Sequence, residues 1–497
     1  MRILTRWLPR AVALAAVAAA GAAAPASANI AVTQISHDVF ANNTSQHQTE
    51  VEPDTYVSPG DTLISTFQVG RFFNGGASDI GFVRRDPGGT WGPPGFLPGT
   101  TQHSTPANPD FERVSDPSVA YDPADGVWLI SSIPLEPGTL QVPTVFINRS
   151  TDDGLTWSNP ISIPAPAVAP SKVDLDKNWT VCDTHPASPH YGNCYTEFDN
   201  FGQNDLEYMS TSTDGGLTWS TPVFPAGNVK GLGGQPLVQP DGDVIVPFES
   251  LRGKIMAFRS TDGGETWGDA STISSVRSHA NSGGLRTSPL PTAEIDGDGN
   301  VYVAWQDCRF TKSCSANDIV FSTSSDGINW SDVARIPIAD VGDAQNDHFI
   351  PGIAVNTATS GSSADVALTY YFYTDASCTP ATCVLQAATI SSQDGGANWG
   401  GQDTIGPSMT LDKIAATSQG RMVGDYISTS FLSGGQYMTT VAIGQSPTGG
   451  LAFDEGMWAP AAPISVATGD LTPSTTSGAH QFTGQGTGET HHALRND

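Results

Sequence analysis

Charged residues suited to binding and acid–base chemistry recur near strand-like runs of this sequence. Arg71 is followed by Asp79, Arg309 follows an Asp-Cys pair, and Arg421 precedes an Asp-Tyr pair that ends at Tyr426. Two carboxyl groups can act as general acid and general base, and an arginine offers a fork of N–H donors to an anion. Other polar candidates for the same site are Asp116, Glu294, Asp347 and His348. The combination indicates a pocket for a polar ligand.

A structural explanation exists for any one of these carboxylates. Asp side chains bond to nearby backbone amides, so they are common in turns and at strand starts without any chemical role. The interpretation as a site therefore depends on the convergence of the whole set, and on the elements that position it.

A repeated motif identifies those elements. Residues 212–219 read STDGGLTW. Close copies end at Trp157, Trp267 and Trp399, and weaker copies end at Trp91 and Trp330. The motif recurs about every sixty residues, and such a period indicates a repeat architecture.

Each copy of the motif is predicted to be a hairpin turn. An alternating, strand-like run precedes it, such as LEYMST at 206–211, and a short β-like run follows it, such as PISIP at 160–164. Asp can bond its own backbone amides in a turn, and Gly accepts a positive φ. The Trp is a large apolar side chain suited to pack beneath the turn. We expect these Asp residues to hold turns and to do no chemistry.

The motif resembles the Asp-box of sialidase-like β-propellers, over about residues 30–460. The resemblance implies an all-β fold, a β-propeller of four-stranded antiparallel blades. The units count to seven blades, with residues 30–38 as the outer strand of the last, whereas the sialidase resemblance implies the alternative of six. In a propeller the innermost strands line the axis and their entry loops converge at one end. The Asp-box turns are expected on the rim, away from that end.

The N-terminal residues predict a secreted protein. Three arginines precede an apolar run at 11–23, and residues 26–28 read ASA, which is the pattern of a signal peptide cleaved near Ala28. The run is too short for a membrane span. We expect the propeller at 29–465 and a disordered low-complexity tail at 466–497.

Cysteine spacing indicates disulfides, and the net charge argues against some kinds of binding partner. The cysteines form three close pairs, Cys182/Cys194, Cys308/Cys314 and Cys378/Cys383. Close spacing in an exported chain favours local disulfides over metal ligation, and neither a CxxC nor an HExxH motif occurs. The formal charge of −28 argues against nucleic acid and anionic membranes as partners.

The sialidase resemblance also implies roles for particular residues. Arg71 resembles a pocket arginine and Asp79 the acid/base, while Arg309 resembles a late member of an arginine triad. Asp116 lies in RVSDP, which resembles a segment entering the second blade. Tyr426 is the candidate nucleophile. The remaining candidates are Arg421 as a clamp, Glu294 or Glu249 as the base, and Asp347 and His348 as substrate contacts.

The sequence also departs from the sialidase pattern. The family's first triad arginine belongs to an Arg-Ile-Pro motif that enters the first blade, but no Arg occurs between positions 11 and 70. EPDTY stands there instead, at 52–56, and the Arg-Ile-Pro at 335–337 follows the fifth motif. Acidic groups around an anion pocket are unfavourable unless arginines outnumber them.

Three hypotheses on function follow. The first is an exo-acting, sialidase-like glycoside hydrolase with an incomplete arginine triad, acting on extracellular glycans and needing no cofactor. The second is a non-catalytic propeller that binds a glycan or a surface protein. The third is a cation-dependent member in which axial Asp oxygens hold calcium. We expect a monomer, and the sequence does not name the sugar.

Overall fold

The computed structural model describes residues 29–339, 342–469 and 471–473. The predicted signal peptide and residues 474–497 of the predicted tail lie outside the described residues. The described part consists of β-strands and short 3-10 helices, which confirms the all-β prediction. No helix within it is long and apolar enough to cross a membrane.

Sheets of mostly antiparallel strands follow one another in chain order, and the pairing of Ala77 with Val114 joins the first two into one eight-stranded sheet. The first contains β3 (Glu50–Val57), β4 (Leu63–Arg71), β5 (Ala77–Arg85) and β6 (Gly95–Phe96). The second contains β7 (Arg113–Asp122), β8 (Val127–Leu135), β9 (Phe146–Ser150) and β10 (Ile161–Ser162). The third contains β11 (Leu175–Cys182), β12 (Cys194–Asn200) and β13 (Leu206–Ser212).

The next sheets repeat the same order. The fourth contains β14 (Gly231–Leu232), β15 (Leu237–Val238), β16 (Val244–Ser250), β17 (Lys254–Ser260) and β18 (Ser271–Ser275). The fifth contains β19 (Thr292–Ile295), β20 (Val301–Asp307), β21 (Asp318–Ser324) and β22 (Ala334–Arg335). The sixth contains β23 (Asp347–Val355), β24 (Val366–Tyr373), β25 (Val384–Ser392), β26 (Asp403–Thr410) and β1 (Asn29–Ile30).

The last sheet combines both ends of the described chain. It contains β29 (Ser428–Phe431), β30 (Gln436–Gly444), β31 (Glu455–Pro460), β32 (Ile464–Ser465) and β2 (Val32–Gln34). β2 pairs with β31 and is the outer strand of this sheet, as the sequence predicts, whereas the preceding β1 pairs with β26 of the sixth sheet. A hairpin of β27 (Ala416–Thr417) and β28 (Gly420–Arg421) precedes it.

Short 3-10 helices lie between the strands. They are η1 (Pro170–Lys172), η2 (Phe201–Gln203), η3 (Ser282–Gly284), η4 (Lys312–Cys314), η5 (Gly361–Ser363) and η6 (Leu411–Lys413).

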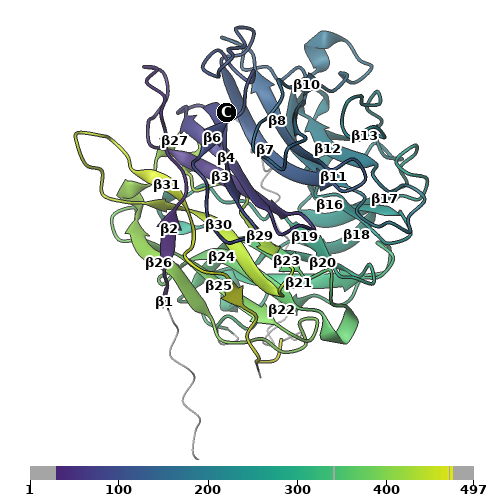
Figure 1. Ribbon diagram of the computed structural model, residues 1–497. Coiled ribbons are helices and arrows are strands. Elements are labelled where there is room, and N and C mark those ends of the chain that lie inside the picture. The colour runs from purple at the N-terminus through teal and green to yellow at the C-terminus, as the bar shows by residue number, and fades with distance from the viewer. Residues whose placement is uncertain (1–28, 340–341, 470, 474–497) are drawn as a thin grey trace, which may run out of the picture.

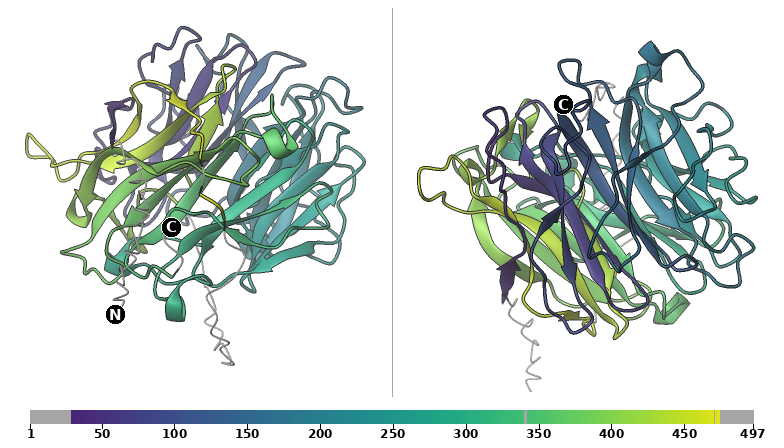
Figure 2. Two further views of the ribbon diagram at one scale, coloured as in Figure 1. Left: turned by 90° about the horizontal axis from the view of Figure 1, so that it is seen from below. Right: turned by 45° about the horizontal axis from the view of Figure 1, so that its top comes forward.

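The sheets are arranged around a common centre, and the last lies beside the first (Figure 1). Figure 2 shows the same succession from two other directions. One strand of each sheet touches one strand of the next: β3 contacts β7, β7 contacts β11, and the series continues through β15, β19, β23 and β29 back to β3. At the last of these contacts, Thr55 Oγ1 lies 2.9 Å from Ser428 Oγ and 2.8 Å from Ser430 Oγ.

The hydrophobic core lies between neighbouring sheets. Leu129 and Ile147 of the second sheet share one cluster with Phe198 and Trp219 of the third. Farther along the chain, the fully buried Trp399 lies in another such cluster. The Trp of the repeated motif therefore packs between sheets in these two copies, where a large apolar side chain adds to the buried area.

The repeated motif closes a tight hydrogen-bonded turn. Asp214 Oδ1 accepts bonds from Thr218 N and Ser212 Oγ, both at 2.9 Å, and Asp214 Oδ2 accepts one from Thr218 Oγ1 at 2.6 Å. Gly215 and Gly216 have φ values of 65° and 77°, which L side chains rarely adopt. Because both carboxylate oxygens of Asp214 accept hydrogen bonds within the turn, a structural role is favoured for this Asp.

The register of the third sheet shows which end this turn occupies. Ser212, the first residue of the motif, pairs with Cys194, which in turn pairs with Cys182 at the end of β11. Asp176, at the start of β11, pairs with Asp199 at the other end of the sheet. In this sheet the motif and the start of the first strand therefore lie at opposite ends.

Candidate functional site

A buried ion network lies near the starts of the first strands. Lys177 Nζ lies 2.5 Å from Asp425 Oδ2, 3.6 Å from Asp116 Oδ2 and 3.9 Å from Glu52 Oε1. Arg286 donates two parallel bonds to Asp425, from Nε to Oδ1 at 2.8 Å and from Nη2 to Oδ2 at 2.6 Å. Each of these five side chains is at most 2% exposed. We call them the ion network.

An uncommon backbone conformation places three members of the ion network. Glu52, Asp116 and Lys177 have φ values of 56°, 48° and 52°, and each lies in a bulge of its strand. A left-handed conformation at a residue other than Gly costs on the order of 1–3 kcal/mol. The bulge of β23 has the same conformation at Ile350, φ 50°, but this side chain packs in the hydrophobic core.

Close backbone approaches place the other two members. Asp425 follows Gly424, where a Cβ atom would lie 3.0 Å from the backbone nitrogen of Glu52, so only glycine leaves enough room. The backbone nitrogen of Arg286 donates to the carbonyl oxygen of Arg421 at 2.6 Å. The β27–β28 hairpin therefore fixes the segment that carries Arg286.

Arg71 and Gln68 extend the ion network. Arg71 Nη1 donates to Gln68 Oε1 at 2.9 Å, and Gln68 Nε2 donates to Glu52 Oε2 and, at 2.9 Å, to Ser115 Oγ. Within the described residues, Arg71 Nε, Arg71 Nη2 and Arg286 Nη1 are buried without a hydrogen-bond acceptor. Buried donors of this kind are rare, and they can bond to a ligand that enters the site.

The ion network moves the pKa values of two carboxyls in opposite directions. Burial raises the pKa of Glu52 to about 7, with Asp116 adding to the rise and Lys177 opposing it. Burial also acts to raise the pKa of Asp425, but Arg286 and Lys177 outweigh it and hold this pKa below its usual range. Near neutral pH one carboxyl therefore carries a proton part of the time while the other stays ionised. General acid–base catalysis uses such a pair.

The charges of the site are balanced. The site contains three cations, Arg71, Lys177 and Arg286, and three carboxyls, those of Glu52, Asp116 and Asp425. Cations do not outnumber carboxylates when all three acids are ionised. The site therefore differs from a pocket of free arginines that clamps a substrate carboxylate.

A hollow with an aromatic wall lies beside the ion network. Its lining includes Lys177, Trp179, Gly234, Pro291 and Tyr426. The rings of Trp179 and Tyr426 meet edge to face with centroids 5.2 Å apart. The Tyr426 hydroxyl donates to the carbonyl oxygen of Pro117 at 3.0 Å, and burial raises the pKa of this hydroxyl well above its usual value. The hydroxyl is thus held in its protonated form.

Two of the predicted catalytic carboxyls lie elsewhere. Asp79 Oδ1 accepts bonds from Thr100 Oγ1 and from the backbone nitrogen of Ile80, and burial raises the pKa of Asp79 to about 8. Glu294 lines a different cavity together with Asp54, and burial raises the pKa of Glu294 to about 8. Neither carboxyl bonds to the ion network within the described part of the chain.

That second cavity is lined by residues from β3, β7, β11, β15, β19, β23 and β29, namely Asp54, Val119, Thr180, Leu237, Glu294, Ile353 and Ser428. It is bounded by both polar and apolar side chains.

The remaining predicted contacts are spread over three places. Arg309 bonds to Asp307 through Nε at 2.9 Å and Nη2 at 2.7 Å, and Arg421 Nη1 donates to the carbonyl oxygen of Ile414. Asp347 Oδ1 accepts bonds from the backbone nitrogen of Asn317 at 2.7 Å and from its side chain at 3.1 Å. Burial lowers the pKa of the neighbouring His348 to about 4, so this imidazole is neutral. Of the predicted set, Arg71, Asp116 and Tyr426 lie at or beside the ion network.

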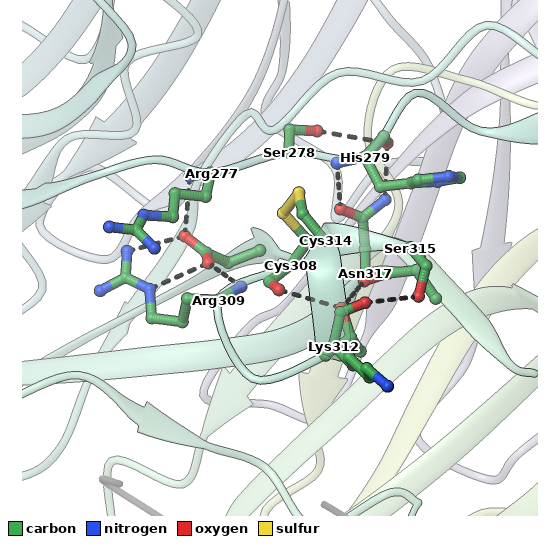
Figure 3. Close-up of a disulfide and its surroundings, with 12 residues drawn as sticks. Arg277, Ser278, His279, Cys308, Arg309, Lys312, Cys314, Ser315 and Asn317 are labelled. Carbon is green, nitrogen blue, oxygen red and sulfur yellow. Dashed lines mark hydrogen bonds and ion pairs between the residues drawn. A yellow bond between two sulfur atoms is a disulfide. The ribbon is translucent and has the colours of Figure 1, made fainter. Parts of the chain in front are cut away.

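The predicted disulfides are confirmed. Bonds join Cys182 to Cys194, Cys308 to Cys314 and Cys378 to Cys383. Figure 3 shows the second of these with Arg277, His279 and Arg309 around it. Within the described residues, no group of three or more His, Cys, Asp or Glu side chains has the geometry of a metal site.

Arg286 has no counterpart among the predicted site residues. It lies in an irregular segment between β18 and β19, where neither a strand pattern nor the repeated motif marks it. Glu52, Lys177 and Asp425 stand at predicted strand starts, and only the bulges and the close approach at Gly424 single them out.

Comparison with known proteins shows what the chain is similar to. Residues 61–287 match the BNR repeat-like domain family. A search among curated proteins finds no match. Among solved structures, the chain is similar to a protein of unknown function from Dyadobacter fermentans, with 16% identity, a TM-score of 0.45, and 86% of this chain and 98% of that chain covered.

Two further solved structures are sialidases by description. A leech intramolecular trans-sialidase has 13% identity and a TM-score of 0.43, with 68% of this chain and 67% of that chain covered. A Trypanosoma rangeli sialidase has 14% identity and a TM-score of 0.46, with 70% of this chain and 57% of that chain covered. The match over residues 61–287 shows that this part of the chain is similar to BNR repeat-like domains.

Proposed function

We propose that this protein is a secreted glycoside hydrolase that acts on extracellular glycans at the ion network. The observation that carries the proposal is the pair Glu52 and Asp425. Both lie within 4 Å of Lys177 Nζ, yet their pKa values move in opposite directions. Glycoside hydrolysis needs one protonated and one ionised carboxyl on either side of the scissile bond.

Each residue of the site has a role in this proposal. Glu52 is the general acid, because its pKa of about 7 leaves it partly protonated at neutral pH. Asp425 is the ionised partner. Arg71 and Arg286 donate their unpartnered N–H groups to sugar hydroxyls, and Trp179 provides an apolar face for a sugar ring.

We also propose that the sheets form a seven-bladed propeller. Support comes from the closed series of contacts among β3, β7, β11, β15, β19, β23 and β29, and from the cavity that all of these strands line. The placement of the ion network at the entry end of the first strands fits an exo-acting enzyme. Such a site binds the end of a glycan at the axis.

A panel of chromogenic glycosides tests the hydrolase proposal. We expect the purified protein to release chromophore from at least one glycoside. Glu52→Gln and Asp425→Asn should each lower that rate by on the order of 100-fold or more. The matched control is Glu50→Gln, since Glu50 lies on the same strand but bonds to Ser36 and takes no part in the ion network. Equal loss of turnover in the control variant would contradict the proposal.

The same panel tests the two displaced carboxyls. Asp79 is the acid/base by the sialidase resemblance, and Glu294 is a candidate base. If Asp79→Asn or Glu294→Gln loses turnover while Glu52→Gln keeps it, the catalytic carboxyl is Asp79 or Glu294 and not Glu52. We expect both variants to keep turnover because neither carboxyl bonds to the ion network within the described residues.

A non-catalytic glycan-binding protein is the second candidate. The balanced charge of the site and the bonded Tyr426 hydroxyl favour it over a true sialidase. In that case the panel shows no hydrolysis, whereas the protein is retained on a glycan array. Loss of that retention in Arg71→Gln would assign the binding to the same site. A chelator added to the array tests the calcium-dependent alternative.

A further inference from the structure

Cations are concentrated in one part of this acidic chain. The segments 250–259, 270–287 and 307–317 contain seven of its 22 Lys and Arg residues but only one of its 50 Asp and Glu residues, Asp307. Two of these cations have partners elsewhere, Arg259 with Asp243 and Arg286 in the ion network. The others are Arg252, Lys254, Arg277, Arg309 and Lys312, and we call these five the basic patch.

Backbone bonds join the three segments into one surface. Lys254 pairs with Ser275 across β17 and β18, and the backbone nitrogen of Val276 donates to the carbonyl oxygen of Gly253 at 2.9 Å. The backbone nitrogen of Cys308 donates to the carbonyl oxygen of Arg277 at 2.7 Å. The Cys308–Cys314 disulfide closes the loop that carries Arg309 and Lys312.

The buried Asp307 accepts hydrogen bonds from two residues of this surface. It is fully buried, and its carboxylate accepts bonds from Arg309 and from the backbone nitrogen of Arg277 at 3.1 Å. Arg309 also donates to Ser274 Oγ at 3.0 Å and to the carbonyl oxygen of Ser275 at 2.5 Å. One arginine is therefore held rigidly while the charge of Asp307 is already compensated.

The side chain of Arg277 has no such compensation. It is exposed, and only its backbone nitrogen bonds to Asp307 within the described residues. Figure 3 shows the side chains of Arg277 and Arg309 extending in the same direction, away from the disulfide. Like charges placed together are unfavourable unless an anion lies between or over them.

Two nearby acidic groups, Asp318 and Asp347, are buried and already paired. Asp318 bonds to Arg335 at 3.2 Å, and Asp347 bonds to Asn317 and lies 3.5 Å from His279. These carboxylates lie below the surface rather than on it. Arg252, Arg277 and Lys312 are exposed, so the basic patch presents net positive charge to solvent.

We propose that the basic patch is a binding surface for an anionic polysaccharide, a glycan chain that carries sulfate or carboxylate groups. Arginine forks suit both groups, and a flexible chain can contact several cations at once. The net charge of −28 repels a polyanion from the rest of the surface, which directs it to this patch. This inference goes beyond the proposed hydrolysis and holds whether or not the ion network is catalytic.

Binding to immobilised dextran sulfate and polygalacturonate, with unmodified dextran as the neutral probe, tests the proposal. We expect the full chain to bind both anionic probes at low salt, to ignore dextran, and to dissociate as salt rises. The double variant Arg277→Ser/Lys312→Ser should bind at least about tenfold more weakly, since two of the exposed cations are gone.

The control variant is Lys172→Ser/Lys413→Ser, which removes the same charge from one exposed and one half-buried lysine outside the basic patch. We expect its affinity to stay within about twofold of the parent chain. Equal weakening in both double variants, equal binding of dextran, or no binding of either anionic probe would each overturn the proposal. Retention on phosphatidylserine vesicles without binding to the polysaccharides would assign the patch to a membrane surface instead.

Discussion

Arg286 and Asp425 form two parallel hydrogen bonds across 139 residues of sequence. The bonds join the irregular segment after β18 to Asp425, three residues before the start of β29. Both side chains are buried, and Lys177 approaches the same carboxylate from the third sheet. The pair therefore ties three distant parts of the chain together at the centre of the molecule and holds Asp425 ionised.

Arg286→Lys should disturb both stability and activity. Lysine keeps the positive charge but cannot donate two parallel bonds to Asp425. We expect the free energy of unfolding to fall by about 1–3 kcal/mol, measured by urea denaturation. Turnover, or glycan affinity if the protein is a binder, should fall at least about tenfold.

Arg335→Lys provides the comparison, because Arg335 is another buried arginine, paired with Asp318 on the fifth sheet. It should lose stability by a similar amount and keep its activity. Loss of activity in proportion to stability in both variants would mean that Arg286 has a structural role alone.

Tyr426→Phe tests whether Tyr426 is a catalytic nucleophile or only lines the hollow. The variant removes one hydrogen bond to the carbonyl oxygen of Pro117, which should lower the free energy of unfolding by about 1 kcal/mol. Because the hydroxyl is buried and held protonated, we expect turnover to change less than about tenfold. A nucleophile would lose on the order of 1,000-fold or more, and initial rates on the most reactive glycoside decide between the two.

Several aspects of the fold could be predicted from sequence because they repeat. The period of the motif predicts successive antiparallel units, and the alternating runs before it predict strands that the structure contains. The strand at 30–38 was predicted to complete the last sheet, and Val32–Gln34 does pair with β31. Local patterns of this kind depend on turn chemistry and alternation, both of which are visible within ten residues.

The site was harder to predict because its geometry is not local. Of the predicted residues, Asp116 and Tyr426 lie near strand starts and Arg71 ends β4, and these three lie at or beside the ion network. Arg286 reaches the centre only because its backbone bonds to Arg421, and no sequence period encodes that contact. The left-handed bulge at Glu52 likewise depends on packing against Gly424.

Asp214→Ala tests the structural role of the repeated motif. The carboxylate of Asp214 accepts three hydrogen bonds within its turn, so its removal should lower the free energy of unfolding by about 1–3 kcal/mol. Activity per folded molecule should be unchanged. The exposed Asp269 lies just beyond the next copy of the motif, and Asp269→Ala should change stability by less than about 0.5 kcal/mol. Loss of turnover in folded Asp214→Ala would instead assign chemistry to the motif.

The stability of this protein should fall as pH rises from mildly acidic to mildly basic values. Burial raises the pKa of Glu50 from 4.5 to about 8, and the pKa of Glu52, Asp54 and Asp79 rises to between about 7 and 8. In this window the unfolded chain has released protons that the folded chain still binds. The stabilising contribution of each group is complete below its unfolded pKa and is lost as pH rises through its folded pKa.

Glu50→Gln isolates one of these groups. Between about pH 5 and 8 a single retained proton lowers the free energy of unfolding by about 1.4 kcal/mol per pH unit, and glutamine cannot contribute this slope. Denaturant midpoints measured at half-unit pH intervals should therefore fall less steeply for the variant than for the parent chain. Parallel curves for the two proteins would show that Glu50 is ionised in the folded state, and that its bonds to Ser36 and Met457 outweigh the effect of burial.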